Sequence, residues 1–80
     1  MKASEKLLNL NNHYLEVFKN SLGVCVCYQD ADVLSTPFRI SEYGVGKDFE
    51  EACENYVRKI SGKKIVFGEG KDREEITVLF

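Results

Sequence analysis

Three cysteines and one histidine are the residues of this sequence that could hold a metal ion. They are Cys25, Cys27, Cys53 and His13. Cys25 and Cys27 lie two residues apart in a segment that alternates like a strand, so their side chains are expected on one face. Structural zinc sites usually take cysteines from turns with two to four intervening residues, which this spacing does not match. We interpret the cysteines as small apolar core residues, predict no metal and no cofactor, and expect reduced thiols in a cytoplasmic protein.

The sequence also lacks the spacings that common catalytic sites require. His13 belongs to no Ser-His-Asp or Cys-His arrangement, and we interpret it as a residue at the border of a helix's apolar stripe. Gly44-Val45-Gly46-Lys47 lies where a strand is expected to lead into a helix, but a phosphate-binding loop needs four residues between its glycines. Asp48 would also place a carboxylate where the phosphate must bind. We interpret the glycines as those of a tight turn and predict that the protein is not an enzyme.

Two charged clusters flank one predicted helix. The acidic cluster at its start comprises Asp48, Glu50, Glu51 and Glu54. The basic cluster at its end comprises Arg58, Lys59, Lys63 and Lys64, with Lys71 and Arg73 further along the chain. Both signs are expected from the helix dipole alone. The acidic cluster is also a candidate surface for a basic partner, and the basic cluster is a candidate contact for nucleic acid.

The helix between these clusters is predicted from Lys47 to Ser61. Its apolar residues follow the spacing of one buried stripe, at Phe49, Ala52, Cys53, Tyr56, Val57 and Ile60. Asp48 and Glu51 form a capping-box pattern at its start, and Gly62 follows its end.

A second helix with a wider apolar face is predicted at the start of the chain. At helical spacing this face would gather Leu7, Leu8, Leu10, Tyr14, Leu15, Val17, Phe18 and Leu22. The asparagines at 9, 11 and 12 leave open whether this helix is continuous or breaks near Asn12 and restarts. The face exceeds what a small outer helix needs, so Leu8 and Leu15 are predicted to bind a partner or a second copy.

The remaining segments predict four strands. Residues 24–28 alternate with period two, residues 29–32 form a turn, and a second strand lies within residues 33–43, at an edge or after Pro37. Residues 63–67 and 75–80 form two more strands around a glycine-rich loop. The order α-β-β-α-β-β predicts one α+β domain over residues 1–80, with a four-stranded antiparallel sheet and both helices on one face.

Length and composition agree with one small globular domain. The chain has 80 residues, of which 44% are apolar and 30% are charged, with a net charge of −2. Neither half is strongly basic, so nucleic-acid binding at physiological salt is not expected. No apolar run is long enough to span a membrane, and the first residues do not have the pattern of a signal peptide.

The run from Tyr43 to Phe67 contains a Gly-x-Gly turn, a Glu-Glu-Ala helix, and Ile-Ser-Gly-Lys leading into a strand. This run resembles a segment of short phage and prophage proteins of unassigned role. It is also similar to the strand, turn and helix of HicB-type antitoxins, although those proteins begin with strands and a helix is expected first here. The resemblance covers about a third of the chain. It implies a small accessory protein of a bacterial virus that binds a host protein, and it implies no catalytic or binding residue.

Together these observations predict a non-enzymatic protein–protein interaction module. Its partner is a host protein, including the case of a defence nuclease whose nucleic-acid groove the acidic cluster would occupy, or a second copy of the chain. The alternative is a nucleic-acid-binding module that uses the basic cluster.

Overall fold

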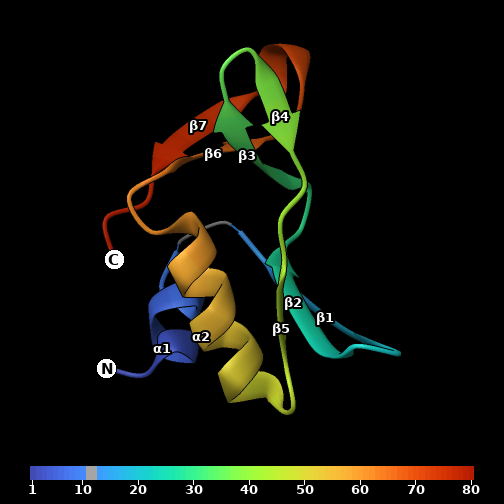
Figure 1. The fold of residues 1–80 in the computed structure, drawn as a ribbon. Coiled ribbons are helices and arrows are strands. Elements are labelled where there is room, and N and C mark those ends of the chain that lie inside the picture. Colours follow the sequence, from blue (N-terminus) through green and yellow to red (C-terminus); the bar gives the residue numbers. More distant parts are fainter. Residues whose placement is uncertain (11–12) are drawn as a thin grey trace.

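The computed structural model describes residues 1–10 and 13–80. Within these residues, two helices and seven strands follow one another, with a short 3-10 turn near the end (Figure 1). Their bounds are α1 Ala3–Leu8, β1 Leu15–Asn20, β2 Gly23–Tyr28, β3 Ala31–Ser35, β4 Phe38–Ile40, β5 Gly44–Gly46, α2 Phe49–Ile60, β6 Lys64–Phe67, η1 Gly70–Asp72 and β7 Glu74–Thr77. Among these, no helix is long and apolar enough to cross a membrane.

The strands form two antiparallel sheets, so the predicted α+β class is confirmed. One sheet has the order β1-β2-β5, and the other has the order β4-β3-β6-β7. The sequence predicted a single four-stranded sheet, whereas seven strands are divided between two. The predicted turn at residues 29–32 does not close a hairpin. Its Asp30 adopts a left-handed conformation with φ 59°, and the chain there leaves the first sheet for the second.

The predicted strand within residues 33–43 is split into β3 and β4. The Thr36–Pro37 peptide is cis, and β4 begins directly after it. β4 is the outer strand of its sheet, as expected of a strand next to a residue that cannot donate to the ladder.

The first helix ends at Leu8, and the helical prediction is wrong for the described residues that follow it, up to Leu22. Leu15–Asn20 instead pairs with Gly23–Tyr28 through six consecutive residue pairs. Tertiary pairing overrides the helical spacing there, because the asparagine-rich stretch before it gives a continuing helix little support. The predicted break near Asn12 lies outside the described residues.

Helix α2 forms as predicted. The Asp48 carboxylate accepts a hydrogen bond from the backbone N–H of Glu51 at 2.9 Å, and the Glu51 carboxylate accepts one from Lys47 at 2.8 Å. Gly62 follows the helix, as predicted, and adopts the left-handed conformation with φ +76° that favours glycine after a helix end.

The glycines before α2 have a different reason from the predicted tight turn. Gly44 and Gly46 lie in strand β5, which runs directly beneath α2. A side chain on Gly44 would overlap the backbone of Ala52 and Tyr56, and one on Gly46 would overlap that of Ala52. The two glycines therefore allow a strand and a helix to approach at backbone distance.

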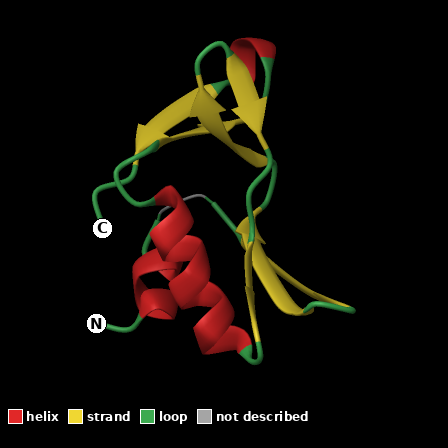
Figure 2. Ribbon diagram, viewed as in Figure 1, coloured by secondary structure: helices red, strands yellow, loops and turns green. Residues whose placement is uncertain are grey.

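The core joins all layers of the fold. Helix α2 covers β2 and β5, and α1 lies beside α2. The second sheet lies across one end of the two helices (Figure 2). Tyr28 sits at the junction, where its hydroxyl donates to the Leu7 carbonyl at 2.6 Å and its backbone N–H donates to the Tyr56 hydroxyl at 3.1 Å. Its ring meets those of Tyr56 and Phe67 edge-on, at centroid distances of 5.8 Å in both cases.

Candidate functional site

Strand β1 is an outer strand with one long side unpaired among the described residues. The backbone N–H of Gln29 donates to the Tyr14 carbonyl at 2.8 Å, which extends the β1–β2 register by one pair. Bonded and non-bonded pairs alternate in an antiparallel ladder. Glu16, Phe18 and Asn20 therefore bond to β2. The backbone groups of Leu15, Val17 and Lys19 point the other way, and we call this side of β1 the free edge.

The side chains of β1 are largely uncovered on both faces. Every residue of the strand after Leu15 is exposed, including Val17 at 53% and Phe18 at 42%. Leu15, Val17 and Lys19 lie on the face that carries α2, since they pair with buried residues of β2. Leaving apolar side chains in water forgoes roughly 25 cal/mol per Å² of their area, so their exposure gives the fold little stability.

The opposite face of the three-stranded sheet, here the outer face, carries an aromatic pair. Phe18 shares this face with Cys25 and Val45, to which it is linked by register. The rings of Phe18 and Tyr43 lie 6.1 Å apart, and Tyr43 is 36% exposed. The two rings form a small exposed apolar surface next to the free edge.

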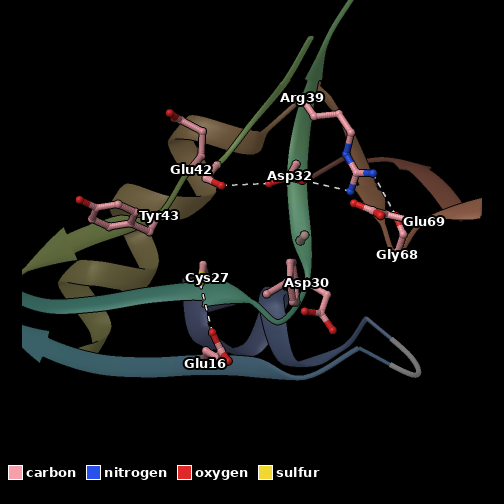
Figure 3. A pocket seen from close by; sticks show the side chains of 12 residues that line it. Glu16, Cys27, Asp30, Asp32, Arg39, Glu42, Tyr43, Gly68 and Glu69 are labelled. Carbon is pink, nitrogen blue, oxygen red and sulfur yellow. Dashed lines mark hydrogen bonds and ion pairs between the residues drawn. The ribbon is translucent and has the colours of Figure 1, made fainter.

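A cavity of about 480 Å³ begins beside the outer face (Figure 3). It lies where the first sheet meets β3 and the segment between β4 and β5, and Glu16, Cys27 and Tyr43 belong to both the outer face and its wall. Five carboxylates and one guanidinium line it, from Glu16, Asp30, Asp32, Glu42, Glu69 and Arg39. We call it the acidic cavity.

The one arginine of this cavity is already engaged. Arg39 forms an ion pair with Asp32 at 3.0 Å and donates to the Gly68 carbonyl at 3.0 Å, as the dashed lines in Figure 3 mark. Ser41 donates to the same Asp32 carboxylate at 3.0 Å. Arg39 and Asp32 neutralise each other, so the remaining four carboxylates give the cavity a negative charge.

The cysteines lie in the core or against it. Cys25 and Cys53 are fully buried, and the inner residues of the sheet separate them, since Cys53 projects from α2. Burial raises the pKa of Cys53 to about 11. Burial and then the nearby Glu16 carboxylate raise the pKa of the Cys27 thiol, which lies 3.9 Å from Glu16. Raised pKa values disfavour the nucleophilic thiolate, and the described residues contain no group of three metal-ligating side chains.

His13 lies outside the helix on which the sequence placed it. Its ring stacks on Phe67 with centroids 3.7 Å apart, and its Nε2 lies 2.7 Å from a carboxylate oxygen of Glu74. Only 12% of its side chain is exposed. The histidine therefore joins the segment before β1 to β6 and β7 of the second sheet.

The two predicted partner-binding leucines do not share a helix face. Leu8 ends α1 and is 61% exposed, whereas Leu15 begins β1 and packs partly against the core. The predicted acidic cluster is largely used inside the chain. Besides the capping bonds of Asp48 and Glu51, Glu50 accepts hydrogen bonds from the hydroxyl of Ser4 at 2.6 Å and from its N–H at 3.1 Å. These bonds lower the pKa of Glu50 and hold α1 against α2, while Glu54 remains exposed.

The predicted basic cluster is also partly engaged. Lys59 donates to the Tyr43 carbonyl at 3.0 Å and lies over its ring, and Lys64 is 3.7 Å from Glu75. Arg58 and Lys63 are exposed. Arg73, further along the chain, donates to Glu75 at 3.0 Å. The structure thus leaves a smaller basic surface than the sequence suggested.

Comparison of the chain with family models, with curated proteins and with solved structures finds no match in any of the three.

The free edge and the acidic cavity were both missed by sequence reasoning. The signal for β1 was present, since Val17 and Phe18 favour strands and follow three poor helix formers at 9, 11 and 12. The cavity had no local signal, because its carboxylates come from four separate stretches of the chain.

Proposed function

We propose that the protein is a non-enzymatic protein-binding module that takes up a strand of its partner along the free edge of β1. The observation that carries this proposal is the exposure of β1 on both faces and along one side, with Val17 and Phe18 uncovered. Folded proteins generally shorten, cover or charge their outer strands, since an open one pairs with other chains. Strand addition uses such an edge for affinity and the flanking side chains for specificity.

The surroundings of β1 support the same function. The aromatic pair of Phe18 and Tyr43 adds an apolar contact on the outer face, and Leu15, one of the residues predicted to bind a partner, lies in the strand itself. Aromatic residues are enriched in protein interfaces. On the sequence resemblance alone, we propose that the chain is a phage-type accessory protein and that its partner is a host protein.

The test compares two substitutions at one position of β1. The N–H of Val17 points to the free edge, so Val17→Pro removes a donor for an added strand without removing a bond to β2. Val17→Thr keeps this donor and the β-branched shape. Each variant and the unaltered protein are used as bait in a lysate of the natural host, after a thermal melt has shown that they are folded.

We expect the unaltered protein and Val17→Thr to capture the same partner, and Val17→Pro to lose it at least tenfold. Equal capture by Val17→Pro would refute docking at this edge. Capture that disappears on nuclease treatment would instead support the nucleic-acid alternative through Arg58, Lys59, Lys63 and Lys64.

A further inference from the structure

On the basis of the proposed function, we propose that the partner strand runs antiparallel to β1 and carries a Lys or Arg opposite Glu16, whose carboxylate at the end of the acidic cavity it pairs with. It carries an apolar residue two positions earlier, opposite Phe18. The occupant is thus a strand of another protein, with a defined charge and spacing. Three features of the structure lead to this.

The first feature is the register that the free edge imposes. Because the backbone groups of Leu15, Val17 and Lys19 point outward, these residues would form the hydrogen-bonded pairs with an added strand. Glu16 and Phe18 would then form the non-hydrogen-bonded pairs, whose Cα atoms lie about 4.5 Å apart and whose side chains are closest. The residues opposite Glu16 and Phe18 are therefore the ones that the surface selects most strongly.

The second feature is charge complementarity. Glu16 stands at the end of the acidic cavity that meets β1, and Asp30, Glu42 and Glu69 lie along the rest of its wall. Figure 3 shows the Glu16 side chain turned toward Cys27 and Arg39 turned toward Asp32 and Gly68. A long cationic side chain opposite Glu16 can pair with the Glu16 carboxylate at this end of the cavity, and the other carboxylates of the wall add a negative potential there.

The third feature is the other face of β1, whose side chains also favour particular residues of the added strand. There Val17 is exposed and apolar and Lys19 is exposed and cationic. An antiparallel strand would meet Lys19, Phe18, Val17 and Glu16 in that order. The complementary sequence, read from its N-terminus, is acidic, apolar, apolar, basic.

A second copy of this chain does not meet these requirements. Symmetric antiparallel pairing of two identical strands keeps each face of the sheet continuous, so residues of one face meet only residues of that face. Glu16 and Lys19 lie on opposite faces and cannot be paired in this way. Centring the pair on Val17 would set Glu16 against Phe18, and centring it on Phe18 would set Val17 against Lys19.

Two peptides of equal composition test this proposal by isothermal titration calorimetry. The matching peptide has the sequence Thr-Glu-Ile-Val-Arg-Val-Thr, and in the control peptide the Glu and the Arg are exchanged. We expect the protein to bind the matching peptide at least tenfold more tightly. Glu16→Lys should remove this preference. Glu5→Lys, an equal charge change on an exposed residue of α1, should leave binding unchanged.

Equal affinity for the two peptides, or binding of neither, would overturn this inference. If Val17→Pro nevertheless loses the lysate partner, the proposed function stands and only the partner chemistry is wrong. If Val17→Pro captures normally and neither peptide binds, both are wrong. A dimer of the unaltered protein that Val17→Pro converts to a monomer in sedimentation would make a second copy the occupant and overturn the proposal.

Discussion

The two outer strands of the first sheet differ in how the protein treats them. Strand β5 lies under α2, with Gly44 and Gly46 fully within the fold, and strand β1 is exposed after its first residue. The outward carbonyl of β5 at Val45 also accepts a hydrogen bond from Asn55 of α2 at 2.6 Å, and the carbonyl of Tyr43, just before the strand, accepts one from Lys59 at 3.0 Å. The same sheet thus has one edge closed by a helix and one left open.

This difference indicates that the open edge is not a consequence of the small size of the chain. The helix that closes β5 uses two glycines, an amide and a lysine for that purpose. Nothing comparable lies against β1 within residues 1–10 and 13–80, where Val17 and Phe18 remain uncovered. An edge of this kind invites pairing with another chain, and we infer that it is kept for that use.

The largest effect is expected from breaking the closed edge with Gly44→Ala. The added methyl group would overlap the backbone of Ala52 and Tyr56, which cannot move without displacing α2. We expect a loss of about 3 kcal/mol in the free energy of unfolding. This corresponds to a melting temperature lower by roughly 15 °C, measured by circular dichroism.

The control is Val45→Ala, which lies between the two glycines and faces away from α2. It should cost only about 1 kcal/mol, the value of a partly buried pair of methyl groups. If Gly44→Ala melts like the unaltered protein, the strand and the helix are not in close contact, and the contrast between the two edges is lost.

The sequence predicted those parts of the two edges that depend on neighbouring residues, and it did not predict those that depend on contacts between distant segments. Helix α2 was predictable because Asp48, Glu51, Gly62 and the apolar stripe are all local. Gly44 and Gly46 were recognised as special, but their reason was not, since the close approach involves Ala52 and Tyr56 on another element.

Strand β1 and the acidic cavity depended on contacts between distant segments. Residues 15–20 fit a helical stripe as well as a strand, and only pairing with β2 decides between the two. The alternation of apolar and polar residues predicted that strands follow residue 29. It did not predict that the chain passes into a second sheet at Asp30. The cavity exists only after Glu16, Asp30, Glu42 and Glu69 have been brought together by both sheets.

An intermediate effect is expected from Tyr56→Phe, which removes a buried hydrogen bond between α2 and β2. The Tyr56 hydroxyl accepts the buried N–H of Tyr28, and the variant leaves that donor without a partner at a cost of about 1.5 kcal/mol. Burial also raises the pKa of Tyr56 to about 12 from an ordinary value of 10.0. The neutral phenol is therefore favoured in the folded state, and its contribution is complete below pH 10 and lost as the pH rises toward 12.

Urea denaturation at a series of pH values measures this contribution. The unaltered protein should lose stability between pH 10 and 12, and Tyr56→Phe should lose less over the same interval. Some loss will remain in the variant, because burial raises the pKa of Tyr28 as well. Parallel curves for the two proteins would show that the Tyr56 hydroxyl is not buried beside Tyr28.

The smallest effect is expected at the open edge itself, from Val17→Thr compared with Val26→Thr. The two valines are directly paired on the same face of the sheet, but Val17 is 53% exposed and Val26 is fully buried. Val26→Thr places a hydroxyl in the core and should cost about 2 kcal/mol. Val17→Thr keeps the β-branched shape and leaves its hydroxyl in water, so the free energy of unfolding should change by less than about 0.5 kcal/mol. Urea denaturation of both variants measures the difference. Similar losses in the two would mean that β1 is part of the core, and the open edge could then not be regarded as a surface kept for a partner.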